Sequence, residues 1–584
     1  MIRPFAPAVD RTPLLVEARP RLAALAAIAT LGSCATPARE PADLVFLNGT
    51  VYPGPTYDAT RPTAEALAVR GDTIVFIGSS AEARRYGGPA ARVIDLEGAF
   101  VYPGWIDAHA DLEGLGRRLD GLELSAAESQ GAVLAGVARA AARREAGAWI
   151  LGAGLDETHW ASGGERWRLT LDSVAPGHPV LLLRSDGAGA VANGSAIAAA
   201  GLVSDEPSGP CLAVDEAGEP TGILDPAAVR LALERLPRPS EVERDSLVAR
   251  GARRMVELGW TQVHDRGGTW ADVDRLRRLY ESGALSLRVY KPIAAPSADA
   301  DSLLAAGPGE RELGNRLVVR ALDLQLDGPL GSRRAALLEP YADLRSARGA
   351  LALSPRAIPP ILLAALRRGV QVRLHATGDS AVRAAFALVK EAQQQFPLPD
   401  HDYFYRRRWR IEGIGRIDPT DLIRFGQRGL MPSVQPAAGT RDLLVGPERL
   451  GAARMQGVQP WRTLIELGVP VAGGTGTPLV EPDLRASYLA AVTRRDSRGY
   501  AGPDSLWHPE EALRREEALA LFTWFAAWAA FQDDERGLLG VGRWADLTIL
   551  SVDLLNAPES EIARAKILMT VVGGTVVHDA RTGS

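Results

Sequence analysis

The chain has 584 residues, of which 46% are hydrophobic and 23% are charged, and its formal net charge is −5. This composition is that of an ordinary folded protein, and the acidic balance gives no reason to expect a nucleic-acid partner. A chain of this length exceeds one small core, so we expect one large domain and a smaller one.

The N-terminus resembles a bacterial lipoprotein signal. Arg11, Arg19 and Arg21 precede an apolar run at residues 22–31, which is too short to span a bilayer and is typical of a signal-peptide core. Small residues then lead to Cys34. We predict that residues 1–33 are a signal peptide and that Cys34 carries a lipid, with an ordinary secretory signal as the alternative. The mature protein would then be lipid-anchored in the bacterial cell envelope, facing the periplasm or the exterior.

Both ends of the mature chain have a β-strand pattern. After a predicted tether at residues 34–43, residues 44–100 alternate apolar and polar positions between NG and GD turn signals. The same pattern returns only at residues 536–584. We therefore predict a small composite β-sandwich built from both ends. Cys211 is the only cysteine besides Cys34, so no intramolecular disulfide is expected.

The middle of the chain, residues 101–535, alternates short apolar runs with helical stretches such as 361–368 and 381–394. This alternation favours parallel βα units, and about eight of them indicate an α/β fold of the TIM (β/α)8 barrel type. The candidate strands are residues 149–155, 179–187, 261–267, 287–295, 322–328, 370–379, 408–413, 430–436 and 469–478. In such a barrel the chemistry lies where the strands end.

An ordered set of motifs resembles the amidohydrolase superfamily, and within it amidohydrolase family three, the branch that includes N-substituted formamide deformylases. The motifs are PGWIDAHADL, DGPLGSRRAALLEPYAD, HATGD, RIEG, SVQP, GGTGTPLVEP and GRWADLTIL. The resemblance covers nearly all of the mature chain. It implies a metal-dependent barrel with a composite β-sandwich that hydrolyses non-peptide C–N bonds of small molecules such as amides or formamides, and it is compatible with a homodimer.

The resemblance also shows that most of the family's metal-ligand positions are substituted. Two histidines are kept, His109 in the first strand motif and His375 in HATGD. The other positions, where the family usually has histidine, lysine or aspartate, are occupied here by Asp111, Ala188, Asp323, Gly413, Ala438 and Gly476. The scaffold motifs between them remain well formed.

One hypothesis is a rebuilt site for a single divalent metal. His109, Asp111, Asp323 and His375 offer two nitrogen and two oxygen donors, a set suited to zinc above all, and also to manganese or iron. Glu412 or Asp379 would then serve as acid or base. Asp327 is a third candidate, although Asp327 and Asp379 are also typical loop braces.

The other hypothesis is a pseudoenzyme, in which His109 and His375 are residual polar groups of a barrel that binds a small molecule or has a structural role without hydrolysis.

Lys291 could be a displaced carboxylated lysine, but a surface or salt-bridged lysine is the simpler interpretation. The His264-Asp265 pair resembles an element that usually braces a loop. Fold resemblance alone does not decide between the two hypotheses.

Overall fold

The computed structural model describes residues 40–55, 63–124, 127–157, 166–184, 189–202, 212–215, 218–399, 402–496 and 507–582. The predicted signal peptide, the predicted lipid-anchor residue Cys34, Ala188 and Cys211 lie outside these residues. Within them, no helix is both long enough and apolar enough to cross a bilayer.

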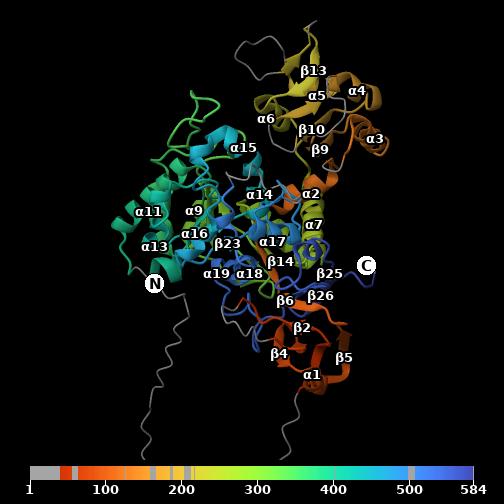
Figure 1. Ribbon diagram of the computed structural model, residues 1–584, viewed down its shortest axis with the longest axis vertical. Helices are drawn as coiled ribbons and strands as arrows, with labels where there is room; N and C mark the ends of the chain where they lie inside the picture. Colours follow the sequence, from red (N-terminus) through yellow and green to blue (C-terminus); the bar gives the residue numbers. More distant parts are fainter. Residues whose placement is uncertain are drawn as a thin grey trace, which may run out of the picture.

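Two sheets contain the first and the last strands of the described chain (Figure 1). The first has the order β4-β3-β1-β5 and uses only N-terminal residues. Its strands are β1 (Ala42–Leu47), β3 (Ala66–Arg70), β4 (Thr73–Gly78) and β5 (Gly87–Asp95). The second has the order β2-β6-β24-β25-β26 and joins strands from both ends. Its strands are β2 (Thr50–Val51), β6 (Phe100–Pro103), β24 (Leu547–Leu550), β25 (Ile567–Val572) and β26 (Thr575–Asp579). One apolar cluster, including Phe46 and Ile549, joins side chains of both sheets.

The centre of the molecule consists of two sheets whose main strands are parallel. One has the order β17-β18-β15-β14-β7 and the other β16-β19-β20-β21-β22-β23. Their bounds are β7 (Trp105–Ala110), β14 (Trp260–Asp265), β15 (Arg288–Tyr290), β16 (Ile293–Ala294), β17 (Arg311–Glu312), β18 (Leu317–Val318), β19 (Ala321–Gln325), β20 (Gln371–His375), β21 (Arg410–Glu412), β22 (Met431–Val434) and β23 (Ala472–Gly473). Seven of the predicted barrel strands therefore occur in these parallel sheets. The hydrogen-bonded strand pairs form two separate sheets and not one closed ring.

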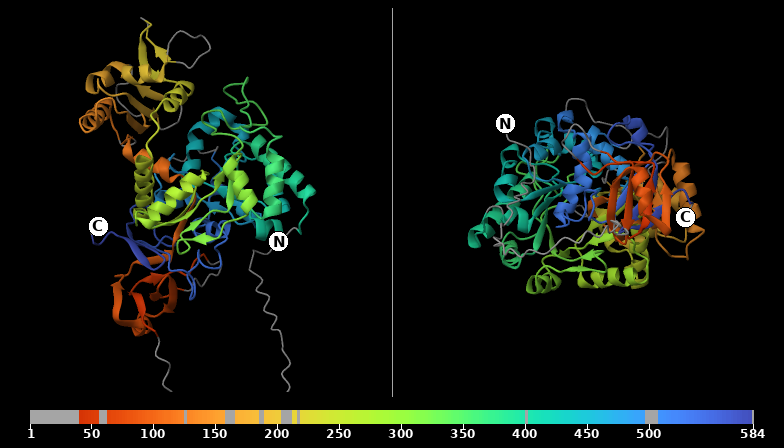
Figure 2. Two further views of the ribbon diagram at one scale, coloured as in Figure 1. Left: turned by 180° about the vertical axis from the view of Figure 1, so that it is seen from behind. Right: turned by 90° about the horizontal axis from the view of Figure 1, so that it is seen from below.

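A separate unit between β7 and β14 corrects part of the sequence prediction. The segments 149–155 and 179–187, predicted as barrel strands, form β9 (Ile150–Leu155) and β10 (Val180–Arg184) of a different sheet, with the order β12-β13-β11-β10-β9-β8. The remaining strands are β8 (Leu122–Glu123), β11 (Ala190–Ala192), β12 (Leu212–Val214) and β13 (Pro220–Leu224). Its helices are α3 (Gln130–Ala141), α4 (Trp167–Val174), α5 (Gly194–Ala200) and α6 (Pro226–Glu234). This unit lies at the end of the molecule opposite the terminal sheets (Figure 2). An apolar run marks a buried strand but does not say which sheet it joins.

Helices follow most central strands and cover them. The predicted helices at 361–368 and 381–394 are confirmed as α10 (Ile358–Arg368) and α11 (Asp379–Gln395). α10 begins with prolines in its first turn, where no backbone N–H is needed, and ends at Gly369 in the left-handed conformation. The others used below are α2 (Leu112–Asp120), α7 (Glu241–Glu257), α8 (Trp270–Glu281), α9 (Ala298–Ala306), α14 (Pro436–Gly439), α15 (Arg441–Leu450), α17 (Leu484–Thr493), α18 (Arg515–Phe522) and α19 (Trp524–Ala529).

Candidate functional site at the strand ends

Polar side chains gather where β7, β19, β20 and β21 end. Residues two apart in a strand share a face. His109 therefore lies on the same face as Asp107 in β7, His375 on the same face as Arg373 in β20, and Glu412 on the same face as Arg410 in β21. Parallel register places His375 beside Glu412. We call His109, Asp323, Arg373, His375, Arg410 and Glu412 the strand-end cluster.

The first pair in the cluster is His109 with Glu412. The Nδ1 atom of His109 lies 3.1 Å from Oε2 of Glu412. Burial raises the pKa of Glu412, but Arg410 and Arg373 outweigh it and hold the pKa well below its usual range. Burial lowers the pKa of His109. The carboxylate is therefore ionised and accepts the Nδ1–H proton, which leaves Nε2 of a neutral His109 as a hydrogen-bond acceptor.

The second pair is His375 with Asp323. The Nε2 atom of His375 lies 2.6 Å from Oδ1 of Asp323, and Oδ2 of Asp323 accepts the backbone N–H of Gly267 at 2.7 Å. Burial raises the pKa of Asp323, but Arg373 and His375 lower it below its usual value. The two imidazole rings of His109 and His375 lie edge to face with centroids 5.1 Å apart.

Two buried arginines lie beneath the histidines. Nε of Arg373 is 3.2 Å from Oδ1 of Asp323 and 3.3 Å from Oε1 of Glu412. Nε of Arg410 is also 3.3 Å from this Oε1, and its Nη1 donates to Nδ1 of His264 at 3.0 Å. The Nε contacts are ion pairs without hydrogen-bond geometry, because Oε1 and both Nε atoms have no hydrogen-bond partner among the described residues. Sequence reasoning missed both arginines, although an arginine inside the apolar strand QVRLH was a visible signal.

Asp111 has other partners. It is the N-cap of α2, where Oδ1 accepts the backbone N–H of Gly114 at 2.8 Å. Its Oδ2 lies 3.4 Å from Nε of Arg266. Both carboxylate oxygens of Asp111 therefore have a local role at the start of the helix, and its part in a metal site stays a prediction.

Asp379 and Asp327 have the contacts of loop braces. Oδ1 of Asp379 accepts the backbone N–H groups of Leu338 and Ser380, and Oδ2 contacts Arg416. Asp327 accepts three backbone N–H groups, at 2.7, 2.8 and 2.9 Å, and burial raises its pKa to about 6. A catalytic role for Asp379 stays a prediction, and its contacts favour the structural interpretation.

Lys291 is salt-bridged and buried. Its Nζ lies 2.6 Å from Oδ2 of Asp265 and donates to the carbonyl of Arg266 at 3.0 Å. The other oxygen of Asp265 accepts the backbone N–H of Leu112. Asp265 and Lys291 therefore join β14 to the start of α2, as expected of a bracing pair. Burial holds the pKa of His264 well below its usual value.

Glycine at two of the substituted positions removes the donor side chain, and only Gly413 has space for a Cβ atom. A Cβ atom at Gly413 would meet nothing closer than Oγ1 of Thr377 at 3.6 Å, and the φ angle there is +95°. At Gly476 a Cβ atom would lie 2.8 Å from Cβ of Ala438. The positions where the family usually has a histidine and an aspartate therefore contribute no ligand atoms.

These residues do not fit a divalent metal of the family's usual kind. Among the described residues, no group of three or more His, Cys, Asp or Glu side chains could hold a metal ion. The two histidines are bonded to different carboxylates, and both carboxylates face a guanidinium group. Two unit charges about 4 Å apart interact by about 4 kcal/mol at an effective dielectric constant of about 20, so a cation placed between these carboxylates would be repelled by Arg373 and Arg410.

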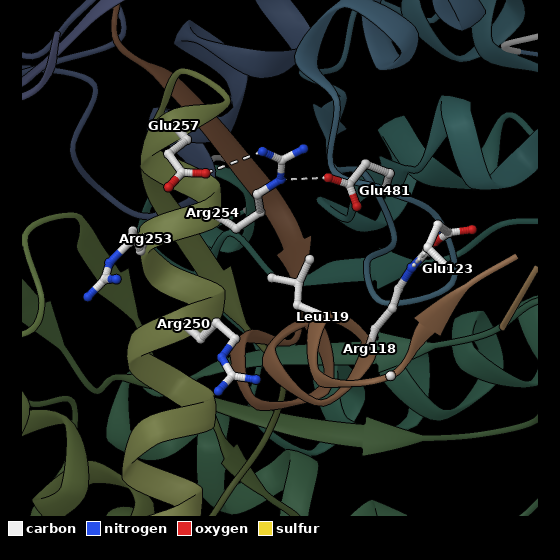
Figure 3. Close-up of a pocket in the computed structure, with 9 residues that line it drawn as sticks. Arg118, Leu119, Glu123, Arg250, Arg253, Arg254, Glu257 and Glu481 are labelled. Atoms are coloured by element: carbon white, nitrogen blue, oxygen red, sulfur yellow. Dashed lines mark hydrogen bonds and ion pairs between the residues drawn. The ribbon is translucent and has the colours of Figure 1, made fainter. Parts of the chain in front are cut away.

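A cavity lies between α2 and α7 and contains none of the predicted site residues (Figure 3). Its volume is about 570 Å³. Its walls are Arg118, Leu119, Gly121, Glu123, Arg250, Arg253, Arg254, Glu257 and Glu481. Arg254 donates to Glu481 at 2.8 Å and to Glu257 at 3.2 Å, and Arg118 pairs with Glu123. Arginines and glutamates of this cavity therefore largely neutralise one another.

Comparisons with known proteins agree with the motifs. The protein LONG AFTER FAR-RED 3 of Arabidopsis thaliana is 30% identical over 94% of this chain and 94% of its own length. The N-substituted formamide deformylase of Arthrobacter pascens is 24% identical over 93% of this chain and 99% of its own. The crystal structure of an uncharacterized metal-dependent hydrolase from Pyrococcus horikoshii OT3 superposes with a TM-score of 0.70 at 25% identity, covering 88% of this chain and 99% of that one. The model of the amidohydrolase family matches residues 92–578, and the chain therefore belongs to the amidohydrolase family.

Proposed function

We propose that the strand-end cluster binds a small molecule with an amide-like group and does not perform the metal-dependent hydrolysis usual in the family. One observation carries the proposal: each of two neighbouring histidines is fixed by a buried carboxylate. Because Glu412 accepts the Nδ1–H of His109, the other ring nitrogen, Nε2 of this neutral imidazole, is an acceptor. It suits a ligand with N–H donors, such as a primary amide, a formamide or a urea.

The binding interpretation is supported by what surrounds the histidines. The side chains of His109 and His375 remain 25% and 13% exposed, whereas Glu412 is fully buried. A ligand can therefore reach the imidazole edges but not the carboxylate that the sequence predicted as acid or base. Burial of Glu412 between two guanidinium groups stabilises its ionised form, so it orients His109 and does not exchange protons with a ligand.

Calorimetry with formamides, primary amides and ureas tests the proposal. We expect one series to bind the wild-type protein and to bind the His109→Ala, His375→Ala double variant at least tenfold more weakly. His178→Ala is the matched control, because the Nδ1–H of His178 donates to the carbonyl of Ala148 in the inserted unit, away from the strand-end cluster. If no compound of any series binds, or if the double variant binds as well as wild type, the proposal is wrong.

The second candidate function is that of a metal-dependent hydrolase whose metal site is weakened. It is favoured by the retention of both histidines at neighbouring strand ends, with ring centroids 5.1 Å apart, and by similarity to a protein named as a formamide deformylase. Zinc at one equivalent per chain, lost in the double variant, together with release of formate from a formamide, would support this candidate over the first.

We also propose that the two central sheets close into one (β/α)8 barrel over residues 101–535, and that residues 44–100 and 536–584 form one composite β-sandwich. Two backbone contacts support closure. The N–H of Gly476, after β23, donates to the carbonyl of His109 in β7 at 3.1 Å. A parallel bridge joins Gly268, after β14, to Ile293 in β16. An experimental structure with an unbroken ring of eight strands tests this assignment.

For the cell, we propose a lipid anchor at Cys34 that holds the mature protein in the bacterial envelope. The support is the sequence pattern before this cysteine. Mass spectrometry of the mature N-terminus should find a lipidated Cys34, and Cys34→Ala should release the protein from the membrane fraction. An unmodified N-terminus starting elsewhere contradicts the anchor. Light scattering of the mature protein tests the homodimer that the family resemblance suggests.

A further inference from the structure

We infer that the guanidinium group of Arg373 is a permanent internal cation that holds Asp323 and Glu412 together, so that the strand-end cluster assembles without a divalent metal. The inference rests on the proposed function only in taking this cluster as the site. It concerns what keeps the cluster in place, whatever ligand it binds.

The position of Arg373 follows from strand register. β20 lies between β19 and β21, and Arg373 is paired with Asp323 on one side and with Arg410 on the other. Glu412 lies two residues beyond Arg410 on the same face of β21. The Arg373 side chain, on the middle strand, can therefore reach the carboxylates of Asp323 on β19 and of Glu412 on β21.

The contacts of Arg373 show that it is fixed. Its Nε lies 3.2 Å from Asp323 and 3.3 Å from Glu412, and its Nη1 donates to the carbonyl of Asp265 at 2.7 Å. Only 1% of the side chain is exposed. Three strands thus hold one guanidinium group from different directions.

Arg373 also links the two histidine pairs. Asp323 fixes His375 and Glu412 fixes His109, and Arg373 is the group that contacts both carboxylates. In a metalloenzyme, a shared cation would join such ligands. Here a covalently attached cation takes that place, and it cannot dissociate.

The charges of the cluster balance without another cation. Arg373 and Arg410 oppose Asp323 and Glu412, and all four are buried. Burial lowers the pKa of Arg373, but Asp323 and Glu412 raise it above its ordinary value. Because an arginine side chain is not deprotonated in proteins, the guanidinium group keeps its charge.

Metal content and thermal stability test the inference. The variants are Arg373→Met, which keeps the length of the side chain and removes its charge, and Arg373→Lys, which keeps a charge. Each is purified without chelator and measured after EDTA treatment and after addition of one to five equivalents of Zn²⁺. We expect wild type to hold less than 0.1 zinc per chain and its Tm to change by less than about 1 °C with either treatment.

Arg373→Met should lose several degrees of Tm, because Asp323 loses its arginine and Glu412 loses one of two. Zn²⁺ should restore at least half of this loss while binding near one equivalent per chain. Arg373→Lys should lose less and respond less to zinc. Arg494→Met is the matched control, since Arg494 is equally buried but donates only to backbone carbonyls. Its loss of Tm should be insensitive to zinc.

Two results overturn the inference. One is stoichiometric metal in wild type that EDTA removes with a fall in Tm. The other is an Arg373→Met variant with the Tm of wild type and no zinc response. If Arg373→Met does not fold, the wild-type measurement and the Arg373→Lys variant still decide. A ligand screen that finds no binder contradicts the proposed function and leaves these metal and Tm results unchanged.

Discussion

The two ends of the central strands each contain a buried carboxylate between two arginines, but the arginines bind these carboxylates differently. At the base, Arg288 donates to both oxygens of Asp546 at 2.9 and 3.1 Å, and the backbone N–H of Gly573 donates at 2.7 Å. Nη2 of Arg536 lies 3.2 Å from the same carboxylate. At the strand-end cluster, Oε1 of Glu412 faces two guanidinium groups and accepts no hydrogen bond from the described residues.

The difference separates a hydrogen-bonded carboxylate from one that has an oxygen without a hydrogen bond among the described residues. Buried polar groups are normally satisfied, and a fully satisfied network makes the core rigid. Asp546 meets this rule and joins β15 to the segment that enters β24. Glu412 breaks it while its other oxygen orients His109. Sites that depart from local satisfaction are where function is expected to reside.

Removing each carboxylate gives the largest effects and tests the comparison directly. Asp546→Asn should destabilise the protein by about 3–5 kcal/mol, because it leaves two buried arginines without their anion and loses charged hydrogen bonds. Glu412→Gln should cost less, since its side chain accepts only the bond from His109 and Arg373 keeps Asp323. Urea denaturation of both variants measures this. An equal or larger loss for Glu412→Gln would mean that the strand-end cluster is as structural as the base.

The sequence predicted this cluster only in part, for a physical reason. Motif order located His109, Asp323, His375 and Glu412, because strand ends in a βα fold converge. It did not predict that each histidine has its own carboxylate. The motif order also did not predict Arg373, since a family pattern contains the positions that bind metal. It does not contain a residue that contacts the carboxylates when the metal ligands are substituted.

For the fold, the sequence was most informative where local pattern decides. The helices at 358–368 and 379–395 and seven parallel strands follow from apolar periodicity and proline and glycine signals. The inserted unit was not predicted, because β9 and β10 have the same buried pattern as the barrel strands. Which sheet a strand joins depends on contacts with residues distant in sequence, and no local signal carries that information.

A third buried carboxyl group, that of Asp442, differs from Asp546 in the direction of its pKa shift. Asp442 in α15 accepts the side-chain amide of Gln459 at 2.9 Å, and burial raises its pKa to about 6. Because this pKa lies above the unfolded value of about 3.9, the folded state binds more protons, and stability is lost as pH rises from about 4 to about 6. Asp546, with arginine partners, has the opposite shift, a pKa lowered below its usual value.

Asp442→Asn keeps an oxygen that can accept from Gln459 and removes this titration. We expect its Tm to exceed that of wild type by about 2 °C at pH 7.5 and to equal it at pH 4, measured by calorimetry at both values. Asp418→Asn is the control: hydrogen bonds from Thr420 lower the pKa of this half-buried aspartate, so its substitution should not stabilise at pH 7.5. A variant of Asp442 with the same Tm difference at both pH values would contradict the assignment.

The smallest expected effect concerns the space beside the cluster. Gly413 and Gly307 have nearly the same φ angles, +95° and +91°, and a Cβ atom at either would meet no atom closer than 3.6 and 3.9 Å respectively. Alanine at either position should therefore cost the strain of a positive φ angle, on the order of 1–3 kcal/mol. Urea denaturation should give equal losses for Gly413→Ala beside the cluster and Gly307→Ala at the end of α9. A clearly larger loss at Gly413 would mean that this wall of the cluster is closed, and that a ligand must approach from the exposed edges of His109 and His375 alone.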